Sequence, residues 1–333
     1  MNAMVPQQIA PVDRSPLRLQ QVPDPTPGPG EVRLRVRCCA ICRTDLHVIE
    51  GDLPRMKLPV IPGHQAVGVV DQLGEGCAHL RVGDRVGVAW LRHTCGRCRF
   101  CTTGRENLCP FSQYAGYHAD GGYAQLAVVP EAFAYRIPDE FDDITAAPLL
   151  CAGIIGYRAL KRTGLHPGGR LALVGFGSSA HVVLQIAVRR GCQVYVVSRN
   201  PNHQKLAREL GAAWAGDDAA DMPAKADAAI LFAPVGSLVP PALASLDRGG
   251  TLALAGIHMS PIPAIDYDTH LFQERDIHPV TANTRQDGRE LLAEAAGSRV
   301  RPHTVTYPLS EANRALQDMK AGRIDGTGVL LME

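Results

Sequence analysis

The chain has 333 residues, of which 46% are hydrophobic, and this is enough for two domains with separate cores. A formal net charge of +1 at pH 7 and an aromatic content of 5% give no basis for binding nucleic acid or an anionic membrane. The N-terminal segment has no basic stretch followed by a long apolar run, and the apolar stretch 146–156 is too short to span a bilayer. We therefore expect a cytoplasmic protein.

The first part of the chain is predicted to be rich in β-strands. Short apolar runs bounded by glycine, proline and aspartate cover residues 31–39, 66–74 and 83–90. The preceding proline-rich segment, residues 23–30, is predicted to be a loop because a strand follows it directly.

Strands and helices alternate in the second part of the chain. The predicted strands at 171–177 and 193–198 are each followed by helical apolar spacing, at 178–191 and 200–212. Further apolar segments follow at 226–233, 241–247 and 249–257. Such alternation implies a parallel sheet with helices on both of its faces.

The pattern changes again near residue 285, after which a helix is predicted at 311–322 and a strand at 327–333. We therefore predict an α/β protein with two domains.

Ten cysteines in a protein expected in a reducing compartment favour metal binding over disulfides. Cys95, Cys98, Cys101 and Cys109 follow the spacing C-x2-C-x2-C-x7-C. Four thiolates can surround one zinc ion and leave no position for a substrate, so these residues predict a structural zinc site. Iron–sulfur ligation, disulfide bonding and unligated thiols are the less favoured alternatives.

The segment GFGSSA, residues 175–180, follows a predicted strand and opens a predicted helix. Gly175 would allow the tight turn, Gly177 would let the backbone approach a pyrophosphate, and Ala180 would keep the helix close to the strand. This context predicts a dinucleotide site with phosphate at the helix N-terminus. The alternative is a glycine turn that binds no ligand.

The residues at the end of the predicted strand 193–198 indicate whether NAD or NADP binds. An NAD site usually has Asp or Glu there, whereas this chain has Ser198 and Arg199. Arginine can pair with a 2′-phosphate and serine can add a hydrogen bond, so we predict NADP in preference to NAD. The alternative is that Arg199 is only a solvated residue at the end of a strand.

A second zinc site is a candidate in the first part of the chain. Cys42, His64 and Cys151 would supply two thiolates and one imidazole, and would leave the fourth position open to water or substrate. Spacing alone does not select these three residues. The chain has further thiols, any of which can be a buried small hydrophobic residue: Cys38, Cys39, Cys77 and Cys192.

These segments together resemble the zinc-dependent medium-chain alcohol dehydrogenases, and are most similar to a bacterial branch of that family. The matching segments occur in family order over essentially the whole chain: CRTDLHV, PGHQAVGVV, VGDRVGV, the four-cysteine segment, GRENLC, DGGYAQ, APLLCAGI and GFGSSAH. The resemblance implies a discontinuous GroES-like β-rich catalytic domain, made of residues 1–150 and 285–333. It also implies a doubly wound parallel-sheet Rossmann domain made of residues 151–284. It also implies a homodimer or homotetramer that acts on a small alcohol or aldehyde.

The resemblance gives roles to residues of the two zinc-related segments. Cys42, His64 and Cys151 would hold the catalytic zinc, and Asp45 would bond the second ring nitrogen of His64. A zinc ion at such a site lowers the pKa of a bound hydroxyl group towards neutrality. Hydride would then pass between a primary or secondary alcohol and NAD(P).

The resemblance also implies a proton relay and a cofactor contact. Thr44 would take the proton from the alcohol, and His47 would pass it to solvent through the nicotinamide ribose hydroxyl. Arg43 would contact the cofactor pyrophosphate. The chain departs from the family at Gln65, where glutamate is usual, and at Ile155, where many relatives have threonine.

Two other functions compete with an alcohol dehydrogenase. A zinc-independent double-bond or quinone reductase of the same superfamily would lack the three catalytic ligands. A non-catalytic nucleotide sensor would bind only the structural zinc. Trp90 is expected either to line a pocket for small or flat substrates or to belong to the core.

Overall fold

The computed structural model describes residues 1–54 and 59–332, and the chain divides into two compact units. Unit 1 comprises residues 1–151, 282–296 and 302–333, and unit 2 comprises residues 152–281 and 297–301. The predicted boundaries therefore differ from these units at Cys151, at 282–284 and at 297–301.

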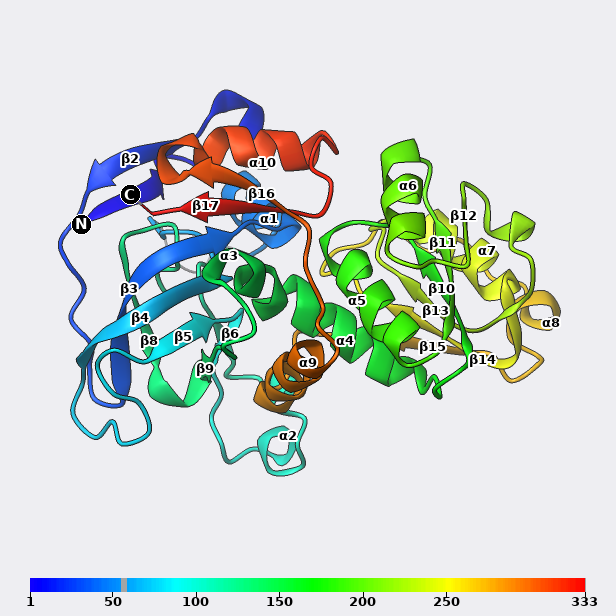
Figure 1. The fold of residues 1–333 in the computed structure, drawn as a ribbon, viewed down its shortest axis with the longest axis horizontal. Helices are drawn as coiled ribbons and strands as arrows, with labels where there is room; N and C mark the ends of the chain where they lie inside the picture. The colour runs from blue at the N-terminus through cyan, green and yellow to red at the C-terminus, as the bar shows by residue number, and fades with distance from the viewer. Residues whose placement is uncertain (55–58, 333) are drawn as a thin grey trace. The chain divides into compact units, whose positions relative to one another are not determined.

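Unit 1 is built on a seven-stranded sheet in which β16, β17, β3, β4, β5 and β9 are neighbours in that order, and β8 also pairs with β3 (Figure 1). The sheet strands are β3 (Glu31–Ala40), β4 (Ala66–Leu73), β5 (Arg85–Val88), β8 (Leu126–Pro130), β9 (Ala134–Arg136), β16 (Thr304–Pro308) and β17 (Thr327–Leu331). Smaller two-stranded pairs are β1 (Asn2–Pro6) with β2 (Leu17–Gln21), and β6 (Leu91–His93) with β7 (Gln113–Tyr114).

Most of this sheet is antiparallel, and burial alternates along β3, as is common in antiparallel sheets with one face on a core. Val32, Leu34 and Val36 are buried on one face of the strand and belong to the apolar core of unit 1, while Arg35 and Arg37 are exposed. The helices of unit 1 are α1 (Arg43–Glu50), α2 (Arg99–Thr102), α3 (Asp143–Ala146), α9 (Arg285–Gly297) and α10 (Ala312–Lys320).

Unit 2 contains a six-stranded sheet whose strands are all parallel, in the order β12-β11-β10-β13-β14-β15. Its strands are β10 (Arg170–Val174), β11 (Gln193–Val197), β12 (Trp214–Gly216), β13 (Ala226–Leu231), β14 (Leu246–Leu254) and β15 (Asp276–Pro279). Its helices are α4 (Ala152–Thr163), α5 (Ser178–Arg189), α6 (Pro201–Glu209), α7 (Val239–Ala244) and α8 (Tyr267–His270).

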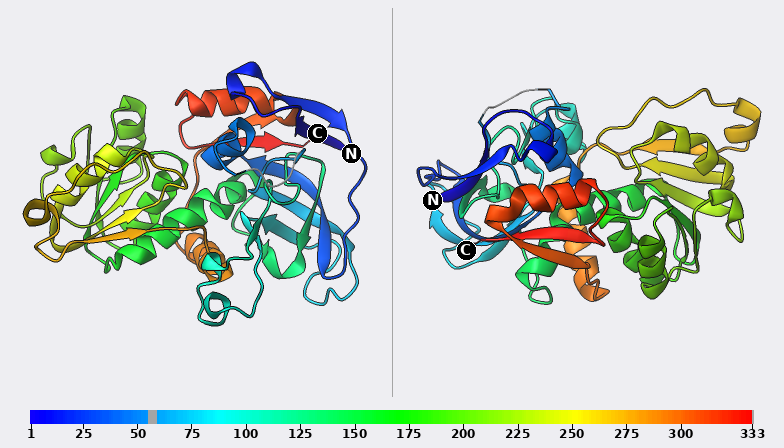
Figure 2. Two further views of the ribbon diagram at one scale, coloured as in Figure 1. Left: turned by 180° about the vertical axis from the view of Figure 1, so that it is seen from behind. Right: turned by 90° about the horizontal axis from the view of Figure 1, so that it is seen from above.

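The predicted parallel sheet with helices on both faces is confirmed, and Figure 2 shows α5 and α7 on opposite faces of it. This sheet is apolar on both sides: Ala172, Leu173, Val196 and Ile230 are all fully buried. Continuous apolar strands are expected when helices cover both faces.

Within the described residues, no single helix is long and apolar enough to cross a membrane. One bent pair, Asp143–Leu150 with Ala152–Thr163, passes such a test by length and composition alone.

Candidate active site

Helix α1 begins at the segment that carries the predicted ligand and relay residues. The backbone N–H of Cys42 donates to Asp45 Oδ2 at 2.8 Å, and the Cys42 sulfur accepts the N–H of Thr44 at 3.3 Å. These two bonds form a capping box, which satisfies backbone groups that the first helical turn would otherwise leave unpaired. The cap fixes the position of the Cys42 sulfur at the start of the helix.

Cys42, His64 and Cys151 come together in unit 1 although they are far apart in the sequence. Their ligand atoms lie within 4.8 Å of one another, and Cys42 Sγ is 3.1 Å from His64 Nε2. His64 and Cys151 are buried, and Cys42 is partly exposed. Two thiol sulfurs and one imidazole nitrogen at this separation suit a zinc ion with a fourth position for another ligand.

Asp45 holds the second nitrogen of His64. Its Oδ1 accepts bonds from His64 Nδ1 at 3.1 Å and from the N–H of Gly63 at 3.2 Å, and the carboxylate is 1% exposed. Donation from Nδ1 leaves Nε2, which faces Cys42, as the ring nitrogen that can bind a metal. The predicted contact between Asp45 and His64 is therefore present in the structure.

The charges in this cluster shift its pKa values. A hydrogen bond with Cys151, together with the nearby His64, holds the pKa of Cys42 well below its usual range although burial acts against this. Burial disfavours the His64 imidazolium, but the charges of Cys42 and Asp45 outweigh burial and raise the pKa of His64 to about 10. A metal ion that binds Nε2 must therefore displace a proton from it. The cluster thus stabilises a Cys42 thiolate, the form of cysteine that binds metals.

The remaining predicted residues of this segment lie on α1. Thr44 is buried, His47 is partly buried one turn further along the same side, and Arg43 is exposed. His47 Nδ1 lies 2.8 Å from the carboxylate of Asp52, which follows the helix.

Trp90 adjoins the candidate metal ligands through an edge-to-face contact with His64, with ring centroids 4.8 Å apart. Its other ring contacts are stacked, with Tyr114 at 4.8 Å and with Tyr117 at 5.9 Å. Trp90 is only 5% exposed, so it packs in the interior, while Tyr114 and Tyr117 are half-buried. These three rings form an aromatic group beside His64.

The four predicted cysteines also converge, in the segment between β6 and β7. All four sulfurs lie within 4.8 Å of one another, with Cys98 and Cys101 3.6 Å apart and Cys95 and Cys101 4.0 Å apart. Four sulfurs bound tetrahedrally to one zinc ion at the usual bond length are separated by about 3.8 Å. All ten cysteines lie within the described residues and are free thiols.

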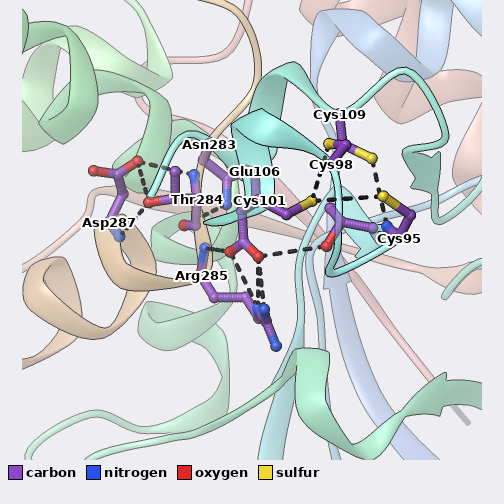
Figure 3. Close-up of polar contacts among 10 residues, drawn as sticks. Cys95, Cys98, Cys101, Glu106, Cys109, Asn283, Thr284, Arg285 and Asp287 are labelled. Atoms are coloured by element: carbon purple, nitrogen blue, oxygen red, sulfur yellow. Dashed lines mark hydrogen bonds and ion pairs between the residues drawn. The ribbon is translucent and has the colours of Figure 1, made fainter. Parts of the chain in front are cut away.

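This four-cysteine segment is tied to the start of α9 by an ion pair between Glu106 and Arg285 (Figure 3). Arg285 Nη2 donates to Glu106 Oε2 at 2.6 Å and the N–H of Arg285 donates to Oε1 at 2.7 Å. The guanidinium also lies over the Phe133 ring, 4.6 Å from its centroid. Burial alone would raise the pKa of Glu106, but Arg285 dominates and lowers it.

In unit 2, the loop after β10 has the backbone that the glycine pattern predicts. Gly175 has φ +88°, and a Cβ there would come within 3.0 Å of the Ala233 nitrogen. Gly177 is the N-cap of α5, and no side chain caps this end of the helix. A Cβ added to Gly177 would meet no atom within 4 Å. Ala180, in the first turn of α5, is fully buried. A helix N-terminus that no side chain caps is a position at which a phosphate can bind.

Ser198 and Arg199 follow β11, which pairs with β10 in parallel register. Both residues therefore lie at the same edge of the sheet as the glycine loop. Ser198 Oγ is 3.3 Å from His203 Nδ1, and Arg199 is exposed. A cation at this edge is suitably placed for the adenosine ribose of a dinucleotide.

Sequence reasoning missed three parts of these sites. They are the Asp52 partner of His47, the Glu106–Arg285 ion pair, and the two tyrosines stacked on Trp90. Gly51 directly before Asp52 was a usable signal, because glycine commonly ends a helix and turns the following residue back on it. The other two contacts join residues distant in sequence and have no local pattern.

One chain that carries a dinucleotide-type sheet and an open set of three metal-binding side chains has the parts of a metal-dependent oxidoreductase. Comparison with protein families makes the class specific. Residues 28–139 match the alcohol dehydrogenase GroES-like domain, and residues 180–297 match the zinc-binding dehydrogenase domain.

Whole-chain relatives agree with these domain matches. The chain is 53% identical to "Probable alcohol dehydrogenase AdhA" of Mycobacterium tuberculosis, over 100% of this chain and 97% of that protein. Among solved structures, it resembles cinnamyl alcohol dehydrogenase from Sorghum bicolor, with a TM-score of 0.90, 28% identity, and coverage of 99% and 96% of the two chains. It also resembles acetophenone reductase from Geotrichum candidum in complex with NAD, with a TM-score of 0.88, 25% identity, and coverage of 99% and 96%.

The chain therefore belongs to the zinc-type medium-chain alcohol dehydrogenase family. The predicted fold class, a GroES-like domain with a Rossmann domain, is confirmed. The protein is an oxidoreductase, and its family uses zinc and a nicotinamide cofactor to act on small alcohols.

Proposed function

We propose that this protein interconverts primary or secondary alcohols with the corresponding aldehydes or ketones, and that it prefers NADP to NAD. The observation that carries this proposal is the convergence of Cys42, His64 and Cys151 to within 4.8 Å. A zinc-independent double-bond or quinone reductase does not require these three metal ligands. A nucleotide sensor that binds only the structural zinc does not require them either.

Cys42, His64 and Cys151 would hold the catalytic zinc, and the four cysteines near 95–109 would hold a second, structural zinc. When bound at the first position, zinc polarises the oxygen of an alcohol or carbonyl substrate, and a nicotinamide exchanges the hydride. The sulfur separations of 3.6 and 4.0 Å in the four-cysteine set support a single ion there. Asp45 would keep the His64 ring in the orientation that presents Nε2.

Proton transfer is assigned to two residues of α1. Thr44 would receive the proton of the alcohol at Oγ1, and His47, three residues further on, would pass it to solvent. Both lie on one side of the helix because residues three apart are neighbours on a helix surface. Arg43 is the exposed cation of the same helical turn, and we propose that it contacts the pyrophosphate.

The aromatic group of Trp90, Tyr114 and Tyr117 supports a preference for flat substrates. Trp90 contacts the ligand His64 directly, so an aromatic or conjugated substrate bound near the metal would meet ring surfaces. Cinnamyl alcohol dehydrogenase and acetophenone reductase, both structural neighbours, act by their names on such compounds.

The experiment that tests the function is reduction of an aldehyde panel by zinc-replete protein, with NADPH and NADH run side by side. Cinnamaldehyde and benzaldehyde would represent flat substrates, and butanal and cyclohexanecarbaldehyde would represent aliphatic ones. We expect turnover with NADPH and a higher kcat/KM for the flat pair. Absence of turnover with both nucleotides would contradict the proposal. It would favour the zinc-independent reductase or the non-catalytic nucleotide sensor instead.

Arg199→Ala is expected to weaken NADPH much more than NADH. A charge-assisted hydrogen bond contributes about 1.5–3 kcal/mol, so KM for NADPH should rise about tenfold to a hundredfold. NADH has no 2′-phosphate, so its KM should change little. Initial rates over a range of each nucleotide, at one fixed aldehyde concentration, measure both values.

The matched control is Arg248→Ala. Arg248 is exposed like Arg199, but it lies near the start of β14 and therefore at the opposite edge of the parallel sheet. It should leave both KM values unchanged. An equal loss of NADPH and NADH in Arg199→Ala would contradict the proposed NADP preference.

Assembly into a homodimer or homotetramer is also proposed from the family resemblance. Strand β15 stands at the edge of the unit 2 sheet, where a second copy could add a strand. Light scattering on the purified protein would give the number of chains.

A further inference from the structure

The end of helix α1 turns the chain back onto His47. The backbone N–H groups of Gly51 and Asp52 both donate to the His47 carbonyl, at 3.1 and 3.0 Å. Gly51 has φ +83°, and a Cβ there would lie 2.6 Å from Ile9 Cγ2. The turn therefore requires glycine, and it fixes the backbone of Asp52 beside His47.

From this turn, the Asp52 carboxylate reaches the side chain of the same histidine. Its Oδ2 lies 2.8 Å from His47 Nδ1. An ionised carboxylate can only accept a hydrogen bond, so Nδ1 must carry the proton. In the neutral ring, this tautomer leaves the lone pair on Nε2.

We propose that Asp52 is a positioning residue for proton transfer by His47, an inference that rests on the relay proposed above. Asp52 fixes the ring tautomer and the ring plane, so that Nε2 is the atom that accepts a proton and later releases it. The proton on Nδ1 stays in the bond to Asp52 throughout. Asp52 itself neither touches substrate nor takes up the proton.

Among the described acidic residues near this turn, Glu50 and Asp13 have other partners, whereas Asp52 directs its carboxylate to this ring. Glu50, at the end of α1, accepts the N–H of Val12 and the Lys320 ammonium, both at 2.8 Å. Asp13 also faces Lys320, at 3.6 Å. The His47 side chain is 15% exposed and that of Asp52 is 48% exposed, so the pair is reachable by solvent, as a proton exit requires.

A purely structural reading is that this is a surface pair with little effect. Exposed pairs typically contribute about 0–1 kcal/mol to stability, and the local turn is already held by Gly51. The experiment must therefore follow the histidine itself, and it must separate kcat from KM.

The test compares Asp52→Ala, Asp52→Asn and the control Asp13→Ala with the unmodified protein. Spectra of protein with 15N-labelled histidine, in which His47 is identified by its loss in His47→Gln, report the tautomer without requiring turnover. We expect Nδ1–H in the unmodified protein and in Asp52→Asn, whose amide oxygen can still accept, and mainly Nε2–H in Asp52→Ala.

Kinetics should follow the tautomer. Loss of such an orienting partner should lower kcat of Asp52→Ala about tenfold while KM changes little. Asp52→Asn should recover most of kcat, and Asp13→Ala should match the unmodified protein.

Three outcomes would overturn the inference alone, and the first two are an unchanged tautomer in Asp52→Ala and an unmodified enzyme that turns over no faster than Asp52→Ala. An equal loss of kcat in Asp52→Ala and Asp52→Asn would also overturn it. Asp52→Asn can still accept the hydrogen bond from His47, so the positioning of the ring would then not be the cause of the loss. Failure of the unmodified protein to reduce any aldehyde would instead overturn the proposed function, and this inference with it.

Discussion

Replacing Cys42 with serine is expected to abolish turnover while the protein stays folded. The substitution removes one of three converging ligands and the thiolate that His64 and Cys151 stabilise. Electrophilic help from a metal contributes several kcal/mol to a transition state, so kcat/KM should fall at least about a thousandfold. Aldehyde reduction, zinc per chain and circular dichroism should be measured on the same preparation.

The matched control is Cys77→Ser, which changes a thiol outside both candidate metal clusters. Cys77 is partly buried and its sulfur donates to the Glu31 carbonyl, at 3.2 Å. This variant should keep full activity and the same zinc content. Full turnover in Cys42→Ser would exclude the proposed catalytic metal site, and loss of two zinc ions would mean that the two clusters are not independent.

Arg285→Ala is expected to destabilise unit 1 and to leave the metal ligands in place. Arg285 is the main partner of Glu106, whose side chain is 10% exposed, so the substitution leaves a largely buried carboxylate without its cation. Breaking a buried pair from one side costs about 3–5 kcal/mol, and the 30% exposure of Arg285 puts the expected loss near the lower limit. Thermal unfolding followed by circular dichroism would measure the loss.

The control for Arg285→Ala is a variant that breaks an exposed ion pair of the same unit. Arg136 pairs with Asp84 at 2.8 Å, but its side chain is 60% exposed. Arg136→Ala should therefore cost about 0–1 kcal/mol. If both variants lowered the unfolding temperature equally, the Glu106–Arg285 pair would not be the anchor of the four-cysteine segment.

The elements that were predictable from sequence are those whose pattern is local. The alternating strands and helices of unit 2 follow from apolar runs and glycine stops. Helix α9 was not predicted, because Gly288 lowers its helical propensity. The structure gives the reason for this glycine: a Cβ there would lie 2.4 Å from the Tyr135 ring, so only glycine lets the helix approach.

The candidate sites divide in the same way. The four cysteines lie in one short segment, and their spacing alone predicted that they gather. Cys42, His64 and Cys151 gather only through tertiary structure, so the family resemblance and not the spacing pointed to them. The Glu106–Arg285 contact joins residues 179 positions apart, and no sequence pattern marks such a pair.

The place of β17 in the unit 1 sheet affects how the protein is made. This strand lies between β16 and β3, where Val329 pairs with Ala40 and Leu331 pairs with Cys38. During synthesis, β3 emerges from the ribosome early, and β8 can then pair with residues 31–35 along the edge that faces away from β4. Residues 38–40 of that edge stay unpaired until β17 has been translated. Unit 2 consists of the continuous run of 130 residues from 152 to 281, together with residues 297–301. It can begin to fold before β17 has been translated. The metal-binding unit would then be completed after the nucleotide-binding unit, with an exposed strand edge as its main risk of aggregation until that point.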